Sequence, residues 1–194
     1  MGRIELELKS VVPDPDQVCT ALLAAGARPG FRGMLHDRRY DRAGELAARD
    51  EVLRVRIYAL GGGGTSSELG WKGRTARSPE GYKQREELEL EVGGSDPGAF
   101  LEALGFSPVH SIDRYIEIFE LTGAHARVEW YPRMDVLVEV EGDAEGIERV
   151  IHASGLSRPS FTDEALTSFT ARYDAAHPNA PSLVSQKEWA GPSR

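Results

Sequence analysis

The sequence predicts an α+β fold built on an antiparallel sheet or barrel. Segments with the period-two alternation of strands outnumber the helical segments, and short turns join most of them. A parallel sheet would need a long crossover, usually a helix, between successive strands. The pattern therefore favours antiparallel strands with few helices.

Seven segments have the residue pattern of strands. In the first of them, apolar residues at positions 4, 6 and 8 share one face, and charged residues at positions 5, 7 and 9 share the other. The predicted strands are residues 4–9, 52–58, 68–72, 85–92, 111–121, 126–130 and 136–141.

Four segments have the residue pattern of helices. Two of them open on an aspartate followed by proline, at Asp14 and Asp96, which is typical of an N-cap and a first helical residue. Gly26 and Gly105 end these two helices. In the C-terminal third, apolar stripes predict helices over residues 144–153 and 162–173.

Length and composition limit the domain count and the class of protein. The 194 residues predict one domain over residues 1–174, followed by a flexible tail at residues 175–194 that is rich in proline. The single cysteine, Cys19, excludes an internal disulfide and a zinc finger. No apolar run approaches the roughly 20 residues of a membrane span, and no apolar leader opens the chain. We therefore expect a cytoplasmic protein with no membrane partner.

Charged side chains of both signs recur on one face of successive strands. If these strands close into a barrel with the apolar faces outward against the helices, the lumen holds the charges in partial desolvation. Cations on opposing walls can then bind a polyanion, while carboxylates without histidine suit Mg²⁺ or Mn²⁺ rather than zinc. A metal–polyphosphate complex would satisfy both sets of charges.

Residues 36–42 fit this pattern less clearly. They mix three arginines with Asp37, Tyr40 and Asp41, which predicts an exposed strand of mixed charge. Arg38 and Arg39 are the candidates on this strand for lining the mouth of a tunnel.

The order of the charged motifs resembles a known superfamily. The motifs are Glu5-x-Glu7-x-Lys9, Arg54-x-Arg56, Lys72-Gly73, Arg85-x-Glu87, Arg114 and Glu139-x-Glu141. In this order, over about residues 4–173, they resemble the CYTH or triphosphate tunnel metalloenzyme superfamily, which includes class IV adenylate cyclases, thiamine triphosphatases and inorganic triphosphatases. The resemblance implies a closed antiparallel barrel of eight strands with helices packed outside it.

The resemblance also implies a role for each charged residue. The metal, Mg²⁺ or Mn²⁺, is expected at Glu5, Glu7, Glu139 and Glu141. The phosphates are expected at Lys9, Arg54, Arg56, Lys72, Arg85, Arg114 and Arg127. The catalytic residues are expected to be Lys9, Glu87 and Glu129.

Two positions depart from the family pattern. Many members carry a Lys-x-Arg pair where this chain has Arg114-Tyr115-Ile116, so the second cation is missing. An aspartate usually precedes the last strand, and Glu129 is the nearest counterpart here. Weaker phosphate binding at Ile116 is the expected consequence.

Three functions remain open at the level of the sequence. A metal-dependent phosphohydrolase acting on a small-molecule triphosphate ranks first, ahead of an adenylate cyclase that makes cyclic AMP and pyrophosphate. A non-catalytic module that binds phosphorylated ligands is the third. The formal charge of −8 disfavours nucleic acid, including the 5′ end of RNA, as the partner. A homodimer is compatible with the sequence.

Overall fold

The computed structural model describes residues 3–60, 63–79, 82–93 and 96–192. Within these residues the chain forms nine strands, four α-helices and two short 3₁₀ turns. The strands are β1 (Arg3–Val11), β2 (Arg28–Asp41), β3 (Val52–Ala59), β4 (Thr65–Lys72), β5 (Ala76–Arg77), β6 (Lys83–Val92), β7 (Ser107–Leu121), β8 (Ala124–Trp130) and β9 (Leu137–Gly142). The helices are α1 (Pro15–Ala24), α2 (Pro97–Ala103), α3 (Ala144–Ser154) and α4 (Leu166–Ala176), and the 3₁₀ turns are Ala47–Arg49 and Arg158–Ser160.

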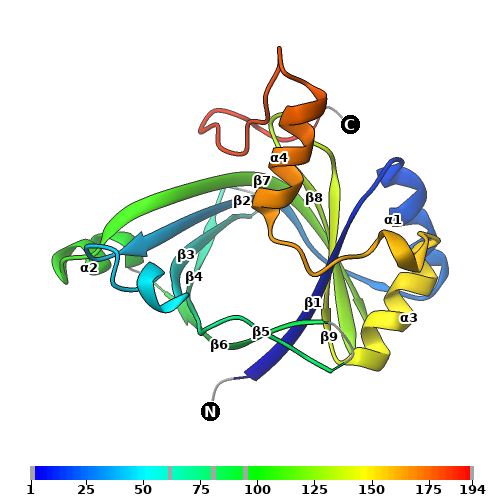
Figure 1. The fold of residues 1–194 in the computed structure, drawn as a ribbon, viewed down its shortest axis with the longest axis horizontal. Helices are drawn as coiled ribbons and strands as arrows, with labels where there is room; N and C mark the ends of the chain where they lie inside the picture. The colour runs from blue at the N-terminus through cyan, green and yellow to red at the C-terminus, as the bar shows by residue number, and fades with distance from the viewer. Residues whose placement is uncertain (1–2, 61–62, 80–81, 94–95, 193–194) are drawn as a thin grey trace.

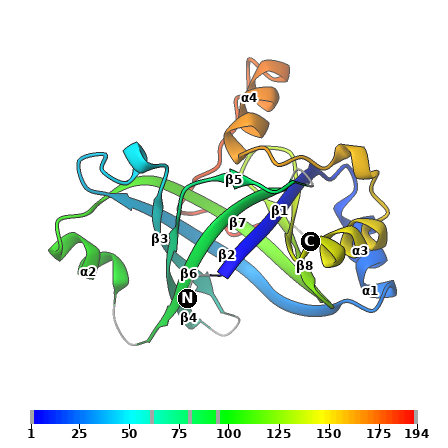
Figure 2. The same ribbon diagram turned by 60° about the horizontal axis from the view of Figure 1, so that its bottom comes forward.

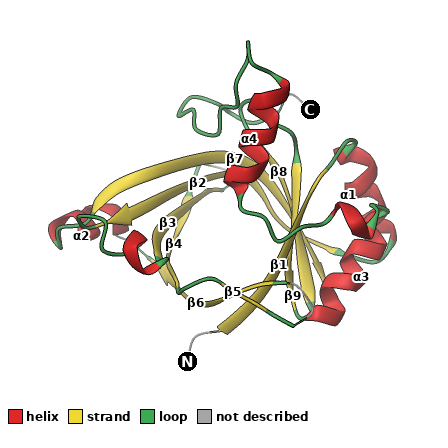
Figure 3. Ribbon diagram, in the orientation of Figure 1, coloured by secondary structure: helices red, strands yellow, loops and turns green. Residues whose placement is uncertain are grey.

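Eight of the strands form a ring, seen from its open side in Figure 1. Its order is β1-β9-β8-β7-β2-β3-β4-β6, and β6 pairs with β1 to complete it. Every pairing in the ring is antiparallel, and the two-residue β5 adds to β6. The predicted antiparallel architecture is therefore confirmed as an eight-stranded ring, with helices outside it (Figure 3).

The largest hydrophobic core lies outside the ring, where α1 and α3 cover strands β1, β8 and β9. Leu8 and Val140 point outward from their strands and pack in the same cluster as Leu22 of α1 and Ile147 of α3. Each such fully buried side chain stabilises the fold by about 1.5–3 kcal/mol. Because side chains alternate along a strand, this outward apolar face directs the charged residues of β1 and β9 into the ring.

The helix termini follow the sequence signals. Asp14 caps α1 by accepting a hydrogen bond from the Gln17 amide at 3.0 Å, and Pro15 follows as the first helical residue. Asp96 caps α2 in the same way. Figures 1 and 2 both place α2 across the ring from α1 and α3, where its Leu101 packs with residues of β2 and β3.

The last helix begins later than the sequence predicts. The predicted helix over residues 162–173 is wrong at its start, because α4 spans Leu166–Ala176. Thr162 instead pairs with Lys9 through two backbone hydrogen bonds of 2.8 Å. The pairing adds an extended segment beside the end of β1, which the helical spacing of the apolar residues did not reveal.

Residues beyond α4, for which the sequence predicts a flexible tail, contact the outside of the ring. Leu183 exchanges backbone hydrogen bonds with Arg133, and the Asp113 amide donates to the Val184 carbonyl at 2.8 Å. The Ser185 hydroxyl donates to the Asp113 carboxylate at 2.9 Å. Among the described residues, no helix has the length and apolar composition needed to cross a bilayer.

Candidate functional site

The charged faces of the strands meet inside the ring. On β1 and β9 the register sets Glu7 opposite Glu141 and Lys9 opposite Glu139. All four side chains are buried. Their position follows from strand geometry, since their apolar neighbours face the helices.

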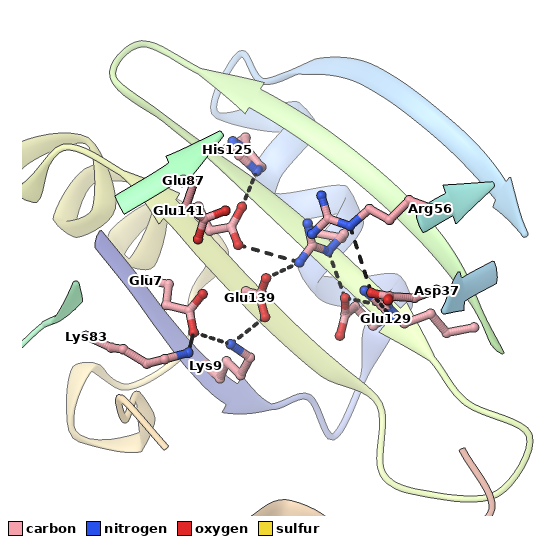
Figure 4. A network of polar contacts seen from close by, with 12 residues as sticks. Glu7, Lys9, Asp37, Arg56, Lys83, Glu87, His125, Glu129, Glu139 and Glu141 are labelled. Atoms are coloured by element: carbon pink, nitrogen blue, oxygen red, sulfur yellow. Dashed lines mark hydrogen bonds and ion pairs between the residues drawn. The ribbon is translucent and has the colours of Figure 1, made fainter. Parts of the chain in front are cut away.

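Three of these residues form a buried carboxylate cluster, drawn in Figure 4. Glu7, Glu139 and Glu141 each offer an oxygen, and the three oxygens lie within 4.8 Å of one another. Like charges this close are held together by cations: Lys9 Nζ lies 2.9 Å from Glu7 and 2.5 Å from Glu139. Arg127 also bonds Glu139. Lys9 and Arg127 thus compensate part of the negative charge of the cluster.

These contacts keep the cluster ionised. Burial favours the neutral form of Glu139, but Arg127 and Lys9 outweigh it and hold its pKa well below the usual range. Burial likewise opposes the charge on Lys9, yet Glu139 and Glu7 raise its pKa. The carboxylates are therefore available as anionic ligands at neutral pH.

The cluster has the donor set for a hard divalent cation. Its ligand atoms are all carboxylate oxygens, which Mg²⁺ and Mn²⁺ prefer. Glu141 Oε1 is buried without a hydrogen-bond partner among the described residues, so it has a lone pair to give. The side chain of the fourth predicted ligand, Glu5, lies outside the described part of the structure.

A second cluster lies on β7 and β8. Glu129 accepts hydrogen bonds from Arg114 at 2.9 Å, Arg127 at 2.7 Å and the Tyr131 hydroxyl at 2.5 Å. Burial and the neighbouring Glu129 raise the pKa of Tyr131 well above its usual value, so the phenol stays protonated as a donor. Glu129 is thereby fixed between two guanidinium groups.

Most of the predicted site residues line one cavity of about 310 Å³ inside the ring. Those that line it are Glu7, Lys9, Arg54, Lys72, Arg85, Arg114, Arg127, Glu129 and Glu139. They come from β1, β3, β4, β6, β7, β8 and β9, so the ring brings together residues that are far apart in the sequence.

Three predicted residues are buried in the ring but do not line this cavity. Arg56 bonds Glu68 at 3.0 Å and Glu89 at 3.1 Å. Glu87 bonds Lys72, and Glu141 accepts from His125 Nε2 at 3.0 Å. Arg56 nevertheless stays next to the cations of the cavity, because it shares Glu89 with Arg54 and Asp37 with Arg114.

Sequence reasoning missed several residues of the interior. The strand predicted at residues 36–42 is confirmed as part of β2, but its predicted exposure is wrong, because Asp37 is only 2% exposed and lies 3.7 Å from Arg114. Lys83 bonds Glu7, and Tyr131 also lines the cavity. Of the two arginines expected at the tunnel mouth, Arg39 lines the cavity and Arg38 does not. The alternation of Asp37 and Arg39 on β2 was the available signal, and the other arginines of the segment hid it.

Comparisons with known proteins place this geometry in a structural context. Neither a scan against protein-family models nor a search of curated proteins found a match. Among solved structures, a Vibrio parahaemolyticus protein assigned as an adenylate cyclase superposes with a TM-score of 0.70 and 16% identity, over 88% of this chain and 99% of its own.

Two further solved structures superpose on the chain with lower TM-scores. The PH1819 protein of Pyrococcus horikoshii OT3 has a TM-score of 0.66 and 20% identity, over 87% of this chain and 98% of its own. A Hippeastrum protein assigned as an adenylyl cyclase, described as having a dominant triphosphatase activity, has a TM-score of 0.59 and 19% identity, over 89% and 96%. The chain therefore has the fold of these proteins, the fold that its resemblance to the triphosphate tunnel metalloenzymes predicts.

Proposed function

We propose that the protein is a metal-dependent phosphohydrolase that acts on a small-molecule triphosphate inside the ring. One observation carries the proposal: two carboxylates of the metal-ligand cluster share a single 310 Å³ cavity with eight cationic side chains. The eight are Lys9, Arg39, Arg54, Lys72, Lys83, Arg85, Arg114 and Arg127. Such a combination suits a polyphosphate with its divalent cation.

In this proposal the carboxylates bind the metal and the cations bind the phosphates. Glu7, Glu139 and Glu141 hold Mg²⁺ or Mn²⁺, which supplies positive charge at the phosphate oxygens. Lys9, Arg54 and the other cations of the cavity bind the phosphate chain and stabilise the charge that develops on the leaving phosphate.

The two remaining predicted catalytic carboxylates differ in how free they are. Glu129 already accepts three hydrogen bonds, so we assign it the role of positioning Arg114 and Arg127. Glu87 Oε2 is buried without a hydrogen-bond partner among the described residues. Glu87 does not line the cavity, its other oxygen pairs with Lys72 and its Oε2 lies 3.6 Å from Arg54. We therefore propose that Glu87 positions Lys72 and Arg54 for phosphate binding.

The test is an assay of the purified protein with Mg²⁺ or Mn²⁺. Tripolyphosphate, thiamine triphosphate, ATP and GTP are incubated separately, and the products are separated by chromatography. We expect orthophosphate from at least one of them, and none after chelation of the metal. Cyclic AMP with pyrophosphate as the dominant products would replace the hydrolase with a cyclase.

Adenylate cyclase is the second candidate, because two proteins that share the fold carry that assignment. Among the described residues, Tyr131 is the single aromatic side chain that lines the cavity, and its hydroxyl is engaged by Glu129. The cavity thus offers little to hold an adenine ring against the metal, which supports ranking hydrolysis first.

A non-catalytic phosphate-binding module is the third candidate. Lys9, Lys83 and Arg127 already pair with the carboxylates of the cluster, and a metal would have to compete with these contacts. Binding of tripolyphosphate without turnover of any of the four substrates would favour this function over the hydrolase.

A further inference from the structure

Arg39 is an interior cation with an unusual neighbour. It lies on β2 directly opposite Arg54 on β3, and both side chains line the cavity. Like charges set directly opposite each other on paired strands destabilise a sheet. The arrangement therefore costs stability unless an anion lies against the two groups.

Among the described residues, no carboxylate lies at ion-pair distance from Arg39. Within the described part of the chain, no side chain forms a hydrogen bond or an ion pair with its guanidinium, and Nε is buried without a partner. The neighbouring carboxylate of Asp37 already lies 3.7 Å from Arg114 and 3.9 Å from Arg56. Each of the other cavity cations has a carboxylate within 4.0 Å, namely Lys9, Arg54, Lys72, Lys83, Arg85, Arg114 and Arg127.

The electrostatic environment agrees with this geometry. Burial lowers the pKa of Arg39, and Arg54 and Arg114 lower it further against the opposing charge of Asp37. Arginine stays charged at any ordinary pH, so burial and the neighbouring cations oppose a charge that Arg39 still carries.

Arg39 also faces the carboxylate cluster across the ring. Its strand, β2, is four strands from β1 in either direction around the ring. Eight strands spaced about 4.8 Å apart enclose a ring at least about 12 Å across. Arg39 and Glu7 thus extend from opposite walls, so a longer phosphate chain contacts both more readily than a shorter one.

We propose that Arg39 binds the phosphate group of the substrate that lies farthest from the carboxylate cluster, and so selects a triphosphate over a diphosphate. The proposal rests on the proposed function for the identity of the anion. The planar guanidinium suits this role because it can donate two parallel hydrogen bonds to one phosphate.

Calorimetry in Mg²⁺ buffer tests the proposal with tripolyphosphate and pyrophosphate as probes. For Arg39→Ala we expect the Kd of tripolyphosphate to rise at least tenfold, which is the loss typical of a charged hydrogen bond. The Kd of pyrophosphate should rise less than threefold. Arg39→Lys should fall between wild type and Arg39→Ala. Arg42→Ala is the matched control, because Arg42 is an exposed arginine just beyond β2 that pairs with Glu45.

Melting curves separate a binding role from a structural one. Removing Arg39 relieves its repulsion of Arg54, so Arg39→Ala should melt at the same temperature as wild type or higher. Unchanged tripolyphosphate affinity, an equal loss for both probes, or a lower melting temperature would each overturn the proposal. A wild-type protein that binds neither probe would also overturn it.

The hydrolase proposal is judged separately by phosphate release from the same samples. Tripolyphosphate binding that depends on Arg39, but without turnover, would reject the hydrolase and retain Arg39 as a phosphate-binding residue. If the protein releases phosphate and Arg39→Ala leaves that release unchanged, the hydrolase is retained and the role of Arg39 is rejected.

Discussion

At the scale of single residues, the interior of the ring is a set of mutually dependent charges. Glu139 contacts Lys9 and Arg127, Glu7 contacts Lys9 and Lys83, and Glu129 joins Arg127 to Arg114. Removing one member leaves its partners buried and uncompensated, which costs more than the pair contributes. Substitutions here should therefore change stability as well as activity.

Glu139→Gln tests this dependence. We expect the metal-dependent release of phosphate to be lost, because one anionic oxygen ligand is removed. We also expect the free energy of unfolding to fall by about 3–5 kcal/mol, since Lys9 and Arg127 lose a charged partner. Urea unfolding and the phosphate assay measure the two effects. Glu145→Gln, on an exposed residue of α3, should change neither, and full activity in Glu139→Gln would remove Glu139 from the metal site.

At the scale of elements, the start of α3 depends on a close approach that only glycine permits. A Cβ on Gly146 would lie 2.4 Å from the carbonyl carbon of Gly123 and 2.6 Å from its oxygen. The Asp143 side chain caps α3 at this point by accepting from the Gly146 amide at 2.7 Å. The contact sets the distance between α3 and the β7–β8 turn, and α3 covers the outer face of β8 and β9.

Gly146→Ala should therefore destabilise the protein although alanine is the better helix former. Overpacking against backbone typically costs about 1–3 kcal/mol, which exceeds the gain of roughly 1 kcal/mol in helix propensity. Chemical denaturation compares it with Glu145→Ala at the preceding, exposed position. If Gly146→Ala is as stable as wild type or more stable, α3 can move away from Gly123 without loss of stability.

The attachment of the C-terminal segment to β7 gives a prediction about pH. Burial favours the neutral form of Asp113, but contacts with His36 at 2.6 Å, Arg38 at 2.7 Å and Ser185 at 2.9 Å hold its pKa below the ordinary 3.8. A lowered carboxyl pKa contributes stability that is complete above the unfolded value and is lost as the pH falls through the folded value.

Asp113→Asn should accordingly melt below wild type at pH 7, and the difference should shrink as the pH drops below 3.8. Melting curves recorded between pH 7 and pH 3 measure the difference. A difference that is constant across this range would show that the charge of Asp113 does not hold the C-terminal segment.

At the scale of the whole molecule, the cavity is lined by carboxylates of the metal-ligand cluster on β1 and β9 and by a cation on each of the other six strands of the ring. A ligand that contacts several walls binds only the closed ring and not the unfolded chain, so binding and folding are linked.

Tripolyphosphate with Mg²⁺ should therefore raise the melting temperature. At 100 times its Kd, a ligand of the folded state adds about 2.7 kcal/mol, which corresponds to roughly 5–10 °C for a chain of this size. Differential scanning fluorimetry measures the melting temperature with Mg²⁺ alone, with tripolyphosphate and a chelator, and with Mg²⁺ and tripolyphosphate together. The three shifts separate the contribution of the metal from that of the phosphate chain. The largest shift should need both, and the absence of any shift would contradict a shared site.

The sequence by itself determined the alternation of the strands, the caps at Asp14 and Asp96, and the charged set that meets inside the ring. These features are local, because one strand period or one helix cap is encoded within a few residues. The charged residues of β1 and β9 could be assigned to the interior because their apolar neighbours needed a core.

Tertiary structure alone decided which of these charges pair with one another. It buried Asp37, paired Lys83 with Glu7 and joined Arg56 to Arg54 through Glu89. Among the described residues it left Arg39 without a carboxylate at ion-pair distance. It also paired Thr162 with Lys9 where the sequence predicted a helix. Each of these outcomes depends on the register of strands that are distant in the chain. The alternation of residues along one strand shows which face a side chain is on, but not which residue of another strand it meets.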